Sequence, residues 1–169
     1  MAYTPHTWAT GEVITEEQLN NIDMALRRAS SGIQAHYLGV QDIGATTQFL
    51  VYLNEDRFTA GGGFTLGENE ILCNFDGLVA VSASIFCNSG FTVGDQVILS
   101  IGVNANVVVS ACHKMQSTGG ETVSCGPVII KVAKGNVLKL KCQNVTGARG
   151  VIGNSSGTYA NNMTAQYLA

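Results

Sequence analysis

Apolar residues near the start of the chain recur at helical spacing. The interval between successive members alternates between three and four residues through Leu19, Ile22, Leu26, Ala29 and Ile33. This spacing is typical of the a/d seam of a short coiled coil, in which one apolar stripe faces a partner helix. We therefore expect a helical, oligomerising stalk over residues 15–36. The alternative is an amphipathic helix that packs on its own domain.

Beyond about residue 45 the apolar period changes from helical to two. In one run the alternate positions Val97, Leu99, Ile101 and Val103 fall on a single face, as they do in a half-buried strand. Similar runs recur at intervals of roughly 8–12 residues with Gly, Asn and Asp between them, which is typical of a sandwich or jelly roll. The pattern predicts a β head over residues 37–169.

The helix has a clear start in the sequence. Thr15 precedes Glu16-Glu17-Gln18, so its hydroxyl can accept the backbone N–H of Gln18 while the Gln18 side chain reaches back, forming a capping box. Acidic residues then begin the helix and Arg27 and Arg28 end it, which suits the helix dipole. About four turns bury too little to hold chains together alone, so we expect the head to dominate association.

Charge is sparse along the chain. Charged residues make up 12 % of it and hydrophobic ones 46 %, and between Leu78 and Ile130 the only charges are Asp95, Lys114 and Glu121. A soluble domain usually has about twice that charged share, so much of the surface must be hidden. No apolar run reaches the ~18 residues of a membrane span. Burial between subunits therefore explains the composition, and we expect an obligate oligomer without membrane insertion.

The charges that exist are unevenly distributed. All acidic residues lie at or before Glu121, and the residues after it carry only the bases Lys131, Lys134, Lys139, Lys141 and Arg149. Lys139 and Lys141 alternate with apolar neighbours, as on an ordinary solvated strand face. The alternative is a patch made by Lys131, Lys139 and Lys141 for an anionic cell-surface glycan or other polyanion. Nucleic acid is disfavoured because the chain is acidic overall and no aromatic residues interleave with the lysines.

The N-terminal arm, residues 1–14, holds the only tryptophan, which could form a lid over the helix or an anchor into another protein. The segment from Tyr3-Thr4-Pro5 through Leu19-Asn20 resembles the opening of small virion appendage proteins of phages of Gram-positive bacteria, known as head fibres or tail and baseplate fibres. The resemblance implies attachment to a capsid or tail protein of the virion. The positions that match and would make the attachment are Trp8, Gly11, Glu12 and Ile14.

The β region carries a second resemblance. Asp76-Gly77 entering the run to Ser84, Gly94-Asp95, Lys134-Gly135-Asn136 and the ending Tyr159 to Leu168 follow the hairpin order of the complement globular-head and tumour-necrosis-factor-like jelly roll. Leu78-Val79 departs from it where the family has Tyr, and Asn136 stands where the family has Asp. The resemblance implies a ten-strand sandwich and a homotrimer whose chain ends lie near the stalk.

The sequence holds no recognisable catalytic or phosphate-binding motif, so we expect neither an enzyme nor a cofactor. His113 follows Cys112 without a second ligand pair at zinc spacing, which favours an ordinary histidine. Glu68, Glu70 and Asp76 could bind calcium but lack EF-hand spacing, and a solvated turn is the simpler interpretation. His36 continues the seam, so three copies could meet on a trimer axis around an anion or a metal.

The remaining features concern the cellular compartment in which the protein is made. Five scattered cysteines, odd in number, read as reduced, buried small hydrophobes, and the N-terminus lacks the basic and apolar regions of a secretory signal. We expect a trimeric virion head or tail fibre, made in the host cytoplasm, whose head decorates the particle or adheres to the host. The alternatives are a freestanding trimeric ligand or glycan-binding lectin, and, with least support, an enzyme such as a depolymerase.

Overall fold

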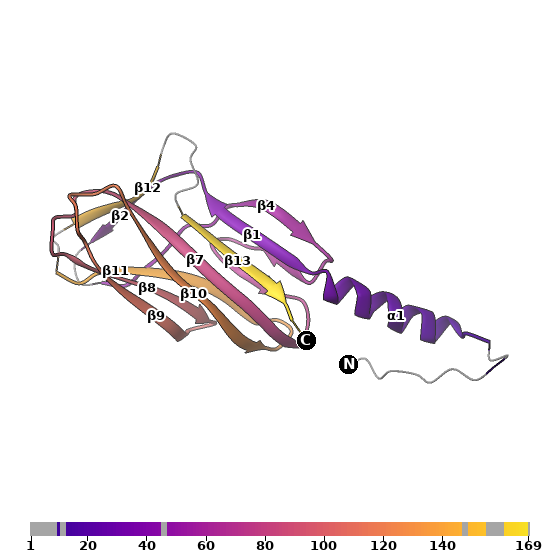
Figure 1. The fold of residues 1–169 in the computed structure, drawn as a ribbon. Coiled ribbons are helices and arrows are strands. Elements are labelled where there is room, and N and C mark those ends of the chain that lie inside the picture. The colour runs from indigo at the N-terminus through magenta and orange to yellow at the C-terminus, as the bar shows by residue number, and fades with distance from the viewer. Residues whose placement is uncertain (1–9, 11–12, 45–46, 147–148, 155–160, 169) are drawn as a thin grey trace.

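The computed structural model describes residues 10, 13–44, 47–146, 149–154 and 161–168. These form one helix followed by a sandwich of two antiparallel sheets, with the helix extending from one end of the sandwich (Figure 1). The C-terminal strand ends at the same end of the sandwich as the helix. The fold is therefore a β head with a short helical extension.

The helix α1 spans Glu16–Ala29 and begins with the expected capping box. The Gln18 amide donates to the Thr15 hydroxyl at 3.3 Å, and the Thr15 amide donates to the Gln18 side-chain oxygen at 2.8 Å. Asp23 and Arg27, four residues apart, form an exposed ion pair at 2.7 Å. No residue of α1 is buried, so the alternative of a helix packed on its own head is not the arrangement found.

The expected stalk range of 15–36 is wrong at its C-terminal end. The strand β1, Gly32–Tyr37, begins three residues after the helix ends. Ile33 and Ala35 both point into the core of the sandwich, where strand pairing outweighs the helical spacing. Ile33 therefore does not belong to the seam, and His36 lies on a strand rather than on the axis of a helical stalk.

The larger sheet, sheet A, has the strand order β2-β12-β7-β13-β1-β4, with β10 on the other edge of β7. Besides β1, its strands are β2 (Gly39–Gly44), β4 (Glu55–Ala60), β7 (Gly77–Ser89), β10 (Glu121–Val132), β12 (Arg149–Asn154) and β13 (Asn161–Tyr167). Sheet B has the order β5-β6-β11-β8-β9, with β3 also on β11. Its strands are β3 (Phe49–Leu50), β5 (Phe64–Leu66), β6 (Ile71–Cys73), β8 (Gln96–Val103), β9 (Asn106–Lys114) and β11 (Val137–Asn144).

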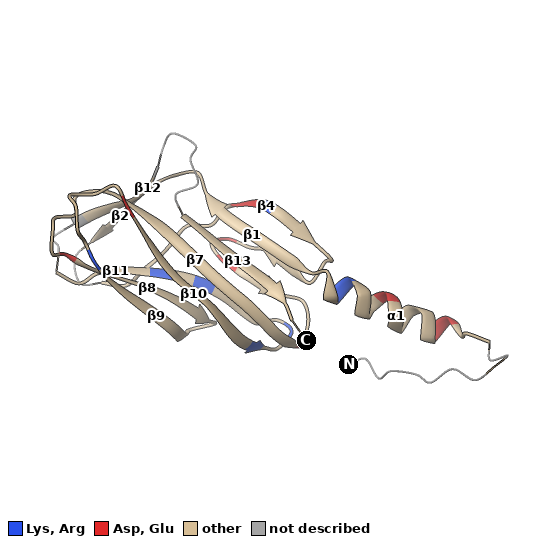
Figure 2. Ribbon diagram, in the orientation of Figure 1, with Lys and Arg blue, Asp and Glu red and all other residues tan. Residues whose placement is uncertain are grey.

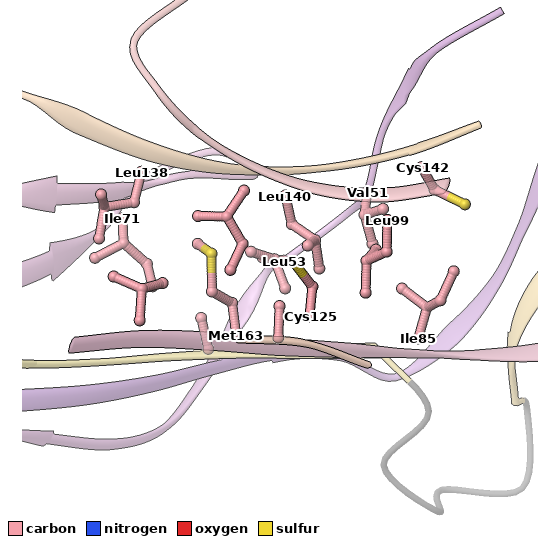
Figure 3. Close-up of a cluster of buried hydrophobic side chains, with 14 of the residues drawn as sticks. Val51, Leu53, Ile71, Ile85, Leu99, Cys125, Leu138, Leu140, Cys142 and Met163 are labelled. Atoms are coloured by element: carbon pink, nitrogen blue, oxygen red, sulfur yellow. The ribbon is translucent and has the colours of Figure 1, made fainter. Parts of the chain in front are cut away.

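The core lies between the two sheets, where alternate residues of facing strands meet (Figure 3). The expected inward positions Val97, Leu99 and Ile101 are each fully buried. The described residues form thirteen strands rather than the ten that the resemblance implied, because short strands such as β3, β5 and β6 supplement the long ones. The expectation of a mainly β sandwich of jelly-roll type is confirmed.

Candidate interaction surfaces

The predicted attachment residues lie almost entirely outside the described part of the chain. Trp8, Gly11 and Glu12 are not described. Ile14 is, and its side chain is 46 % exposed beside Val13, which is 82 % exposed. Two neighbouring exposed aliphatic residues just ahead of a helix are available for contact with another chain. The role of the arm remains a prediction.

The helix presents its remaining seam residues to solvent in the single chain. Leu19 is 53 % exposed and Leu26 65 % exposed, whereas Ile22 is half-buried and Ala29 is exposed. A soluble helix ordinarily covers its apolar stripe, because exposed Leu side chains forgo roughly 1.5–3 kcal/mol each of burial free energy. Within the described residues the seam is therefore a largely exposed apolar surface.

The outward side of sheet A has no charge over its three middle strands. β1, β13 and β7 contain no Asp, Glu, Lys or Arg, and Figure 2 shows them tan along their length. Strand pairing brings six outward side chains of these strands side by side, and we call this surface the neutral face. Its residues are Gln34, Asn162, Thr164, Ala80, Ser82 and Ser84. All six are half-buried.

Hydrogen bonds between strands hold the polar groups of the neutral face in place. The Ser82 and Thr164 hydroxyls lie 2.7 Å apart, and the Asn162 amide donates to the Ser84 hydroxyl at 2.7 Å. A groove of about 520 Å³ runs over this face to the end of the helix, and Phe58, 57 % exposed, lies on its wall. Small, neutral and internally bonded side chains lose little on leaving water, so the face suits burial against a protein.

The two margins of the sandwich differ in character. At the margin where β9 and β10 lie close together, Val107 and Val108 are each 45 % exposed and Ile129 is 65 % exposed. We call these three residues the apolar edge. At the opposite margin, β4 exposes the charged residues Glu55, Asp56 and Arg57. Charge at an edge strand opposes pairing with another chain. The β4 margin therefore suits solvent, whereas the apolar edge suits burial.

The predicted lysine patch is divided between the two sheets. Lys139 and Lys141 lie on the outward side of β11 in sheet B, as their alternation with Leu138, Leu140 and Cys142 predicted, whereas Lys131 lies on β10 in sheet A. Lys139 forms an ion pair with Glu70 at 3.1 Å. The Lys141 ammonium donates to the Ala105 carbonyl at 3.4 Å. Partial neutralisation by Glu70 weakens the patch, and polyanion binding remains a prediction.

His36 lies on the outward side of β1, next to Asn162 of β13. Its side chain is buried, with its Nε2 atom 3.4 Å from a carboxylate oxygen of Glu55 on β4. In the single chain this carboxylate is the anionic group beside His36, and a shared site on a trimer axis remains a prediction. Among the described residues, no three His, Cys, Asp or Glu side chains gather closely enough to hold a metal ion.

A carboxylate that the sequence did not single out closes the loop between β9 and β10. The Glu121 carboxylate accepts from the His113 ring at 2.8 Å, from the Gln116 amide at 2.7 Å and from the Ser117 amide. These hydrogen bonds, that of His113 first, lower the pKa of Glu121 to about 2. His113 is therefore part of a loop clamp rather than a metal site, and Glu121 remains ionised at ordinary pH.

All five cysteines are free thiols. Four are buried as expected, but Cys112 is exposed on the outward side of β9. Burial raises the pKa of Cys73 to about 11 and, together with the nearby Glu121 charge, that of Cys87 to about 12. The buried thiols are therefore poor nucleophiles. In the described part of the chain, no helix has the length and apolar character needed to cross a bilayer.

Comparison with solved structures identifies the fold. The chain is similar to PRD1 vertex protein P5, with a TM-score of 0.62 and 19 % identity over 83 % of this chain and 99 % of that one. It is also similar to Eiger TNF from S. frugiperda (TM-score 0.58, 15 % identity, 82 % of this chain and 92 % of that one). Murine APRIL gives a TM-score of 0.57 at 10 % identity, over 80 % of this chain and 98 % of that one.

No family model matches the sequence, and no curated protein matches it significantly. At identities below 20 % the structural similarity concerns the fold and not the activity. The described strands have the arrangement found in tumour-necrosis-factor-like jelly rolls and in PRD1 vertex protein P5. The head is therefore a jelly roll of the type that the sequence resemblance implied.

Proposed function

We propose that this protein is a phage virion structural protein, a trimeric head or tail fibre with its N-terminal arm on the particle and its jelly-roll head outward. The observation that carries the proposal is the similarity to PRD1 vertex protein P5, which extends over nearly the whole of that chain. The fibre-like opening of the sequence points to the same class independently. The head then decorates the particle or adheres to the host surface.

Two uncovered surfaces support threefold assembly. A closed ring of three copies needs two different patches, one on each side of every subunit. The neutral face and the apolar edge supply such a pair, since both lack charge and the apolar edge exposes aliphatic side chains that gain by burial. The charged margin of β4 is then left at the outside of the ring. The exposed seam of α1 would close on the same axis.

Deleting residues 1–14 tests the attachment. The deletion leaves the helix cap at Thr15 and the entire head intact, so the shortened protein should fold and associate as the full chain does. It should be absent from purified particles, whereas the full chain copurifies with them. Trp8→Ala is the finer variant and Thr10→Ala, in the same arm, its control. If particles incorporate the shortened protein at the full level, the arm is not the attachment element.

A separate test concerns the host surface. If the head adheres to an anionic glycan, Lys141→Glu should weaken the binding of purified protein to host cells. The binding that remains should depend less on salt concentration than that of the unmodified protein. Lys134→Glu, at a turn outside the patch, is the matched control. Equal binding by both variants and the full chain would leave decoration of the particle as the role of the head.

The second candidate is a freestanding trimeric jelly-roll ligand or lectin, favoured by the similarity to Eiger TNF and murine APRIL. Such a protein acts away from the particle. Immunogold labelling of purified virions separates the two candidates, because a fibre remains on the particle after washing whereas a freestanding ligand appears only in the surrounding fluid.

A further inference from the structure

The helix enters the head through only two residues, and the amide and hydroxyl of each donate a hydrogen bond. Ser30 and Ser31 separate α1 from β1. The Ser30 amide donates to the Leu26 carbonyl at 3.1 Å and the Ser31 amide to the Arg28 carbonyl at 2.9 Å. Both serine hydroxyls donate to the Arg27 carbonyl, that of Ser31 at 2.7 Å. The Leu26, Arg27 and Arg28 carbonyls are thus satisfied without a flexible glycine cap.

Ser31 also ties the helix end to the C-terminal strand. It is fully buried, and its carbonyl accepts from the Tyr167 amide of β13 at 3.0 Å. The Tyr167 ring packs edge-on against Phe75 at a centroid distance of 4.7 Å, and Phe75 packs against Phe64 at 5.1 Å. An aromatic cluster therefore lies beneath the junction, and the two ends of the head meet there.

The turn Gly61-Gly62-Gly63 closes over this junction from the β4–β5 side. A Cβ atom added at Gly61 would collide with the Arg27 carbonyl oxygen, and one at Gly63 would lie 2.5 Å from the Ser31 hydroxyl and 2.7 Å from the Phe75 ring. A Cβ at Gly62 would meet nothing within 4 Å. The first and third glycines are therefore where the backbone must approach the helix end closely.

We propose that Gly61, Gly63 and Ser31 form a socket that holds the base of α1, so that the helix and the head move as one rigid body. The socket is a positioning device, and it does not depend on the number of copies that associate. It places any bending of the protein ahead of residue 15 rather than between stalk and head. A helix of this length, roughly 21 Å at 1.5 Å per residue, then sets a fixed direction for the head.

Gly61→Ala and Gly62→Ala form a matched pair that tests the socket. Both residues have a left-handed backbone, with φ of 71° and 67°, so an alanine strains the backbone equally at each. Only alanine at position 61 collides with the helix end. The pair therefore separates loss of the socket from loss of glycine flexibility.

Limited trypsin digestion provides the readout, because the first basic residues of the chain are Arg27 and Arg28 and the next is Arg57. Cleavage at the junction thus releases one N-terminal fragment, at a rate that follows local opening of the helix end. We expect Gly61→Ala to accelerate this cleavage about tenfold or more over Gly62→Ala, with unchanged cleavage after Arg57. Equal rates in the two variants would overturn the proposal.

A second pair of variants tests the socket in case Gly61→Ala fails to fold. Ser31→Ala removes the buried hydroxyl, whereas Ser30→Ala removes an exposed one that donates to the same carbonyl. We expect Ser31→Ala to increase the hydrogen-exchange rate of the Tyr167 amide by about tenfold, while Ser30→Ala and core amides such as that of Leu140 remain unchanged. If the Tyr167 amide already exchanges rapidly in the unmodified protein, the junction is mobile and the proposal is wrong.

Discussion

The Glu121 carboxylate shows how one residue can organise a loop whose own sequence contains little to hold it. Its oxygens accept hydrogen bonds from His113 and from the backbone of Gln116 and Ser117. The loop Gln116-Ser117-Thr118-Gly119-Gly120 has no apolar residue to bury. Hydrogen bonds from the Ser117 hydroxyl to the Gly119 carbonyl and from the Gly120 amide to the Cys87 carbonyl also hold the loop. The Glu121 carboxylate, at the start of β10, adds contacts that need its ionised state.

The low pKa of Glu121 predicts a specific acid sensitivity. In the unfolded chain a Glu has a pKa of about 4.3, and in the folded protein that of Glu121 is about 2. A depressed folded pKa stabilises the protein fully above the unfolded pKa, and this stabilisation is lost as the pH falls through about 2. We expect Glu121→Gln to have a lower melting temperature than the unmodified protein at pH 7. The difference between the two melting temperatures should shrink as the pH falls from 5 to 2.

Glu70→Gln is the control for this titration, because Glu70 pairs with a half-exposed lysine and its carboxylate closes no loop. Melting curves of the three proteins across the pH range provide the measurement. A constant difference between Glu121→Gln and the unmodified protein down to pH 2 would contradict the assignment of the clamp to an ionised carboxylate.

The cysteines make a second prediction at the same scale. Cys73, Cys87, Cys125 and Cys142 are buried, whereas Cys112 is exposed. Because burial excludes the reagent and raises the pKa of the buried thiols, only Cys112 should react with iodoacetamide in the native protein. Mass spectrometry should find one modification before unfolding and five after it. A stoichiometric disulfide in thiol-blocked, non-reduced protein would contradict the prediction.

Among the elements, the helix was predictable at its start and not at its end. The capping box at Thr15 is a local signal and is found as expected. Ile33 fits the seam spacing, but Ile33 and Ala35 also fit the period of two, and pairing with β13 decides between them. That pairing joins residues more than 120 positions apart in the chain, so no local pattern contains it.

The candidate surfaces show the same limit. The scarcity of charge along β7 is visible in the sequence, and burial of this surface between subunits remains a prediction. The neutral face itself depends on the register that places Ser82 beside Thr164 and Ser84 beside Asn162. The socket likewise needs the approach of Gly61 to the helix end, and a run of three glycines does not itself indicate which distant segment the turn will approach.

The stalk and the head should contribute unequally to stability. Ile22 is the half-buried member of the seam, yet a helix of this length is marginal by itself. We expect Ile22→Leu to change stability by less than about 1.5 kcal/mol. Ile22→Asp should fray the helix and lower the melting temperature without dissociating the assembly, because the larger head surfaces hold the copies together.

Leu99→Asp is the contrasting variant, at a fully buried position of sheet B. An uncompensated carboxylate there costs several kcal/mol, which is comparable with the whole stability of a domain. The variant should fail to fold, as judged by circular dichroism. If Ile22→Asp instead yields folded monomers in light scattering, the helix and not the head is the oligomerising element.

For the whole molecule, the central prediction is the number of chains and the surfaces that join them. Light scattering at micromolar protein should give three times the chain mass of 17.7 kDa, and the value should persist on dilution because exposed apolar surfaces favour an obligate assembly. A monomer mass would contradict the proposed trimer directly.

Substitution on the neutral face tests which surface is buried in that assembly. Ser84 lies between Asn162 and Ser124 on sheet A, so Ser84→Arg would place an unpaired guanidinium in a surface that offers no carboxylate on β7 or β13. Because a buried unpaired charge costs several kcal/mol, the trimer should be lost and the protein should unfold or precipitate. Gln96→Arg, at an exposed strand position of sheet B, should leave the mass unchanged. If Ser84→Arg remains a trimer of undiminished melting temperature, the copies associate through another surface and the neutral face is left open to a different partner.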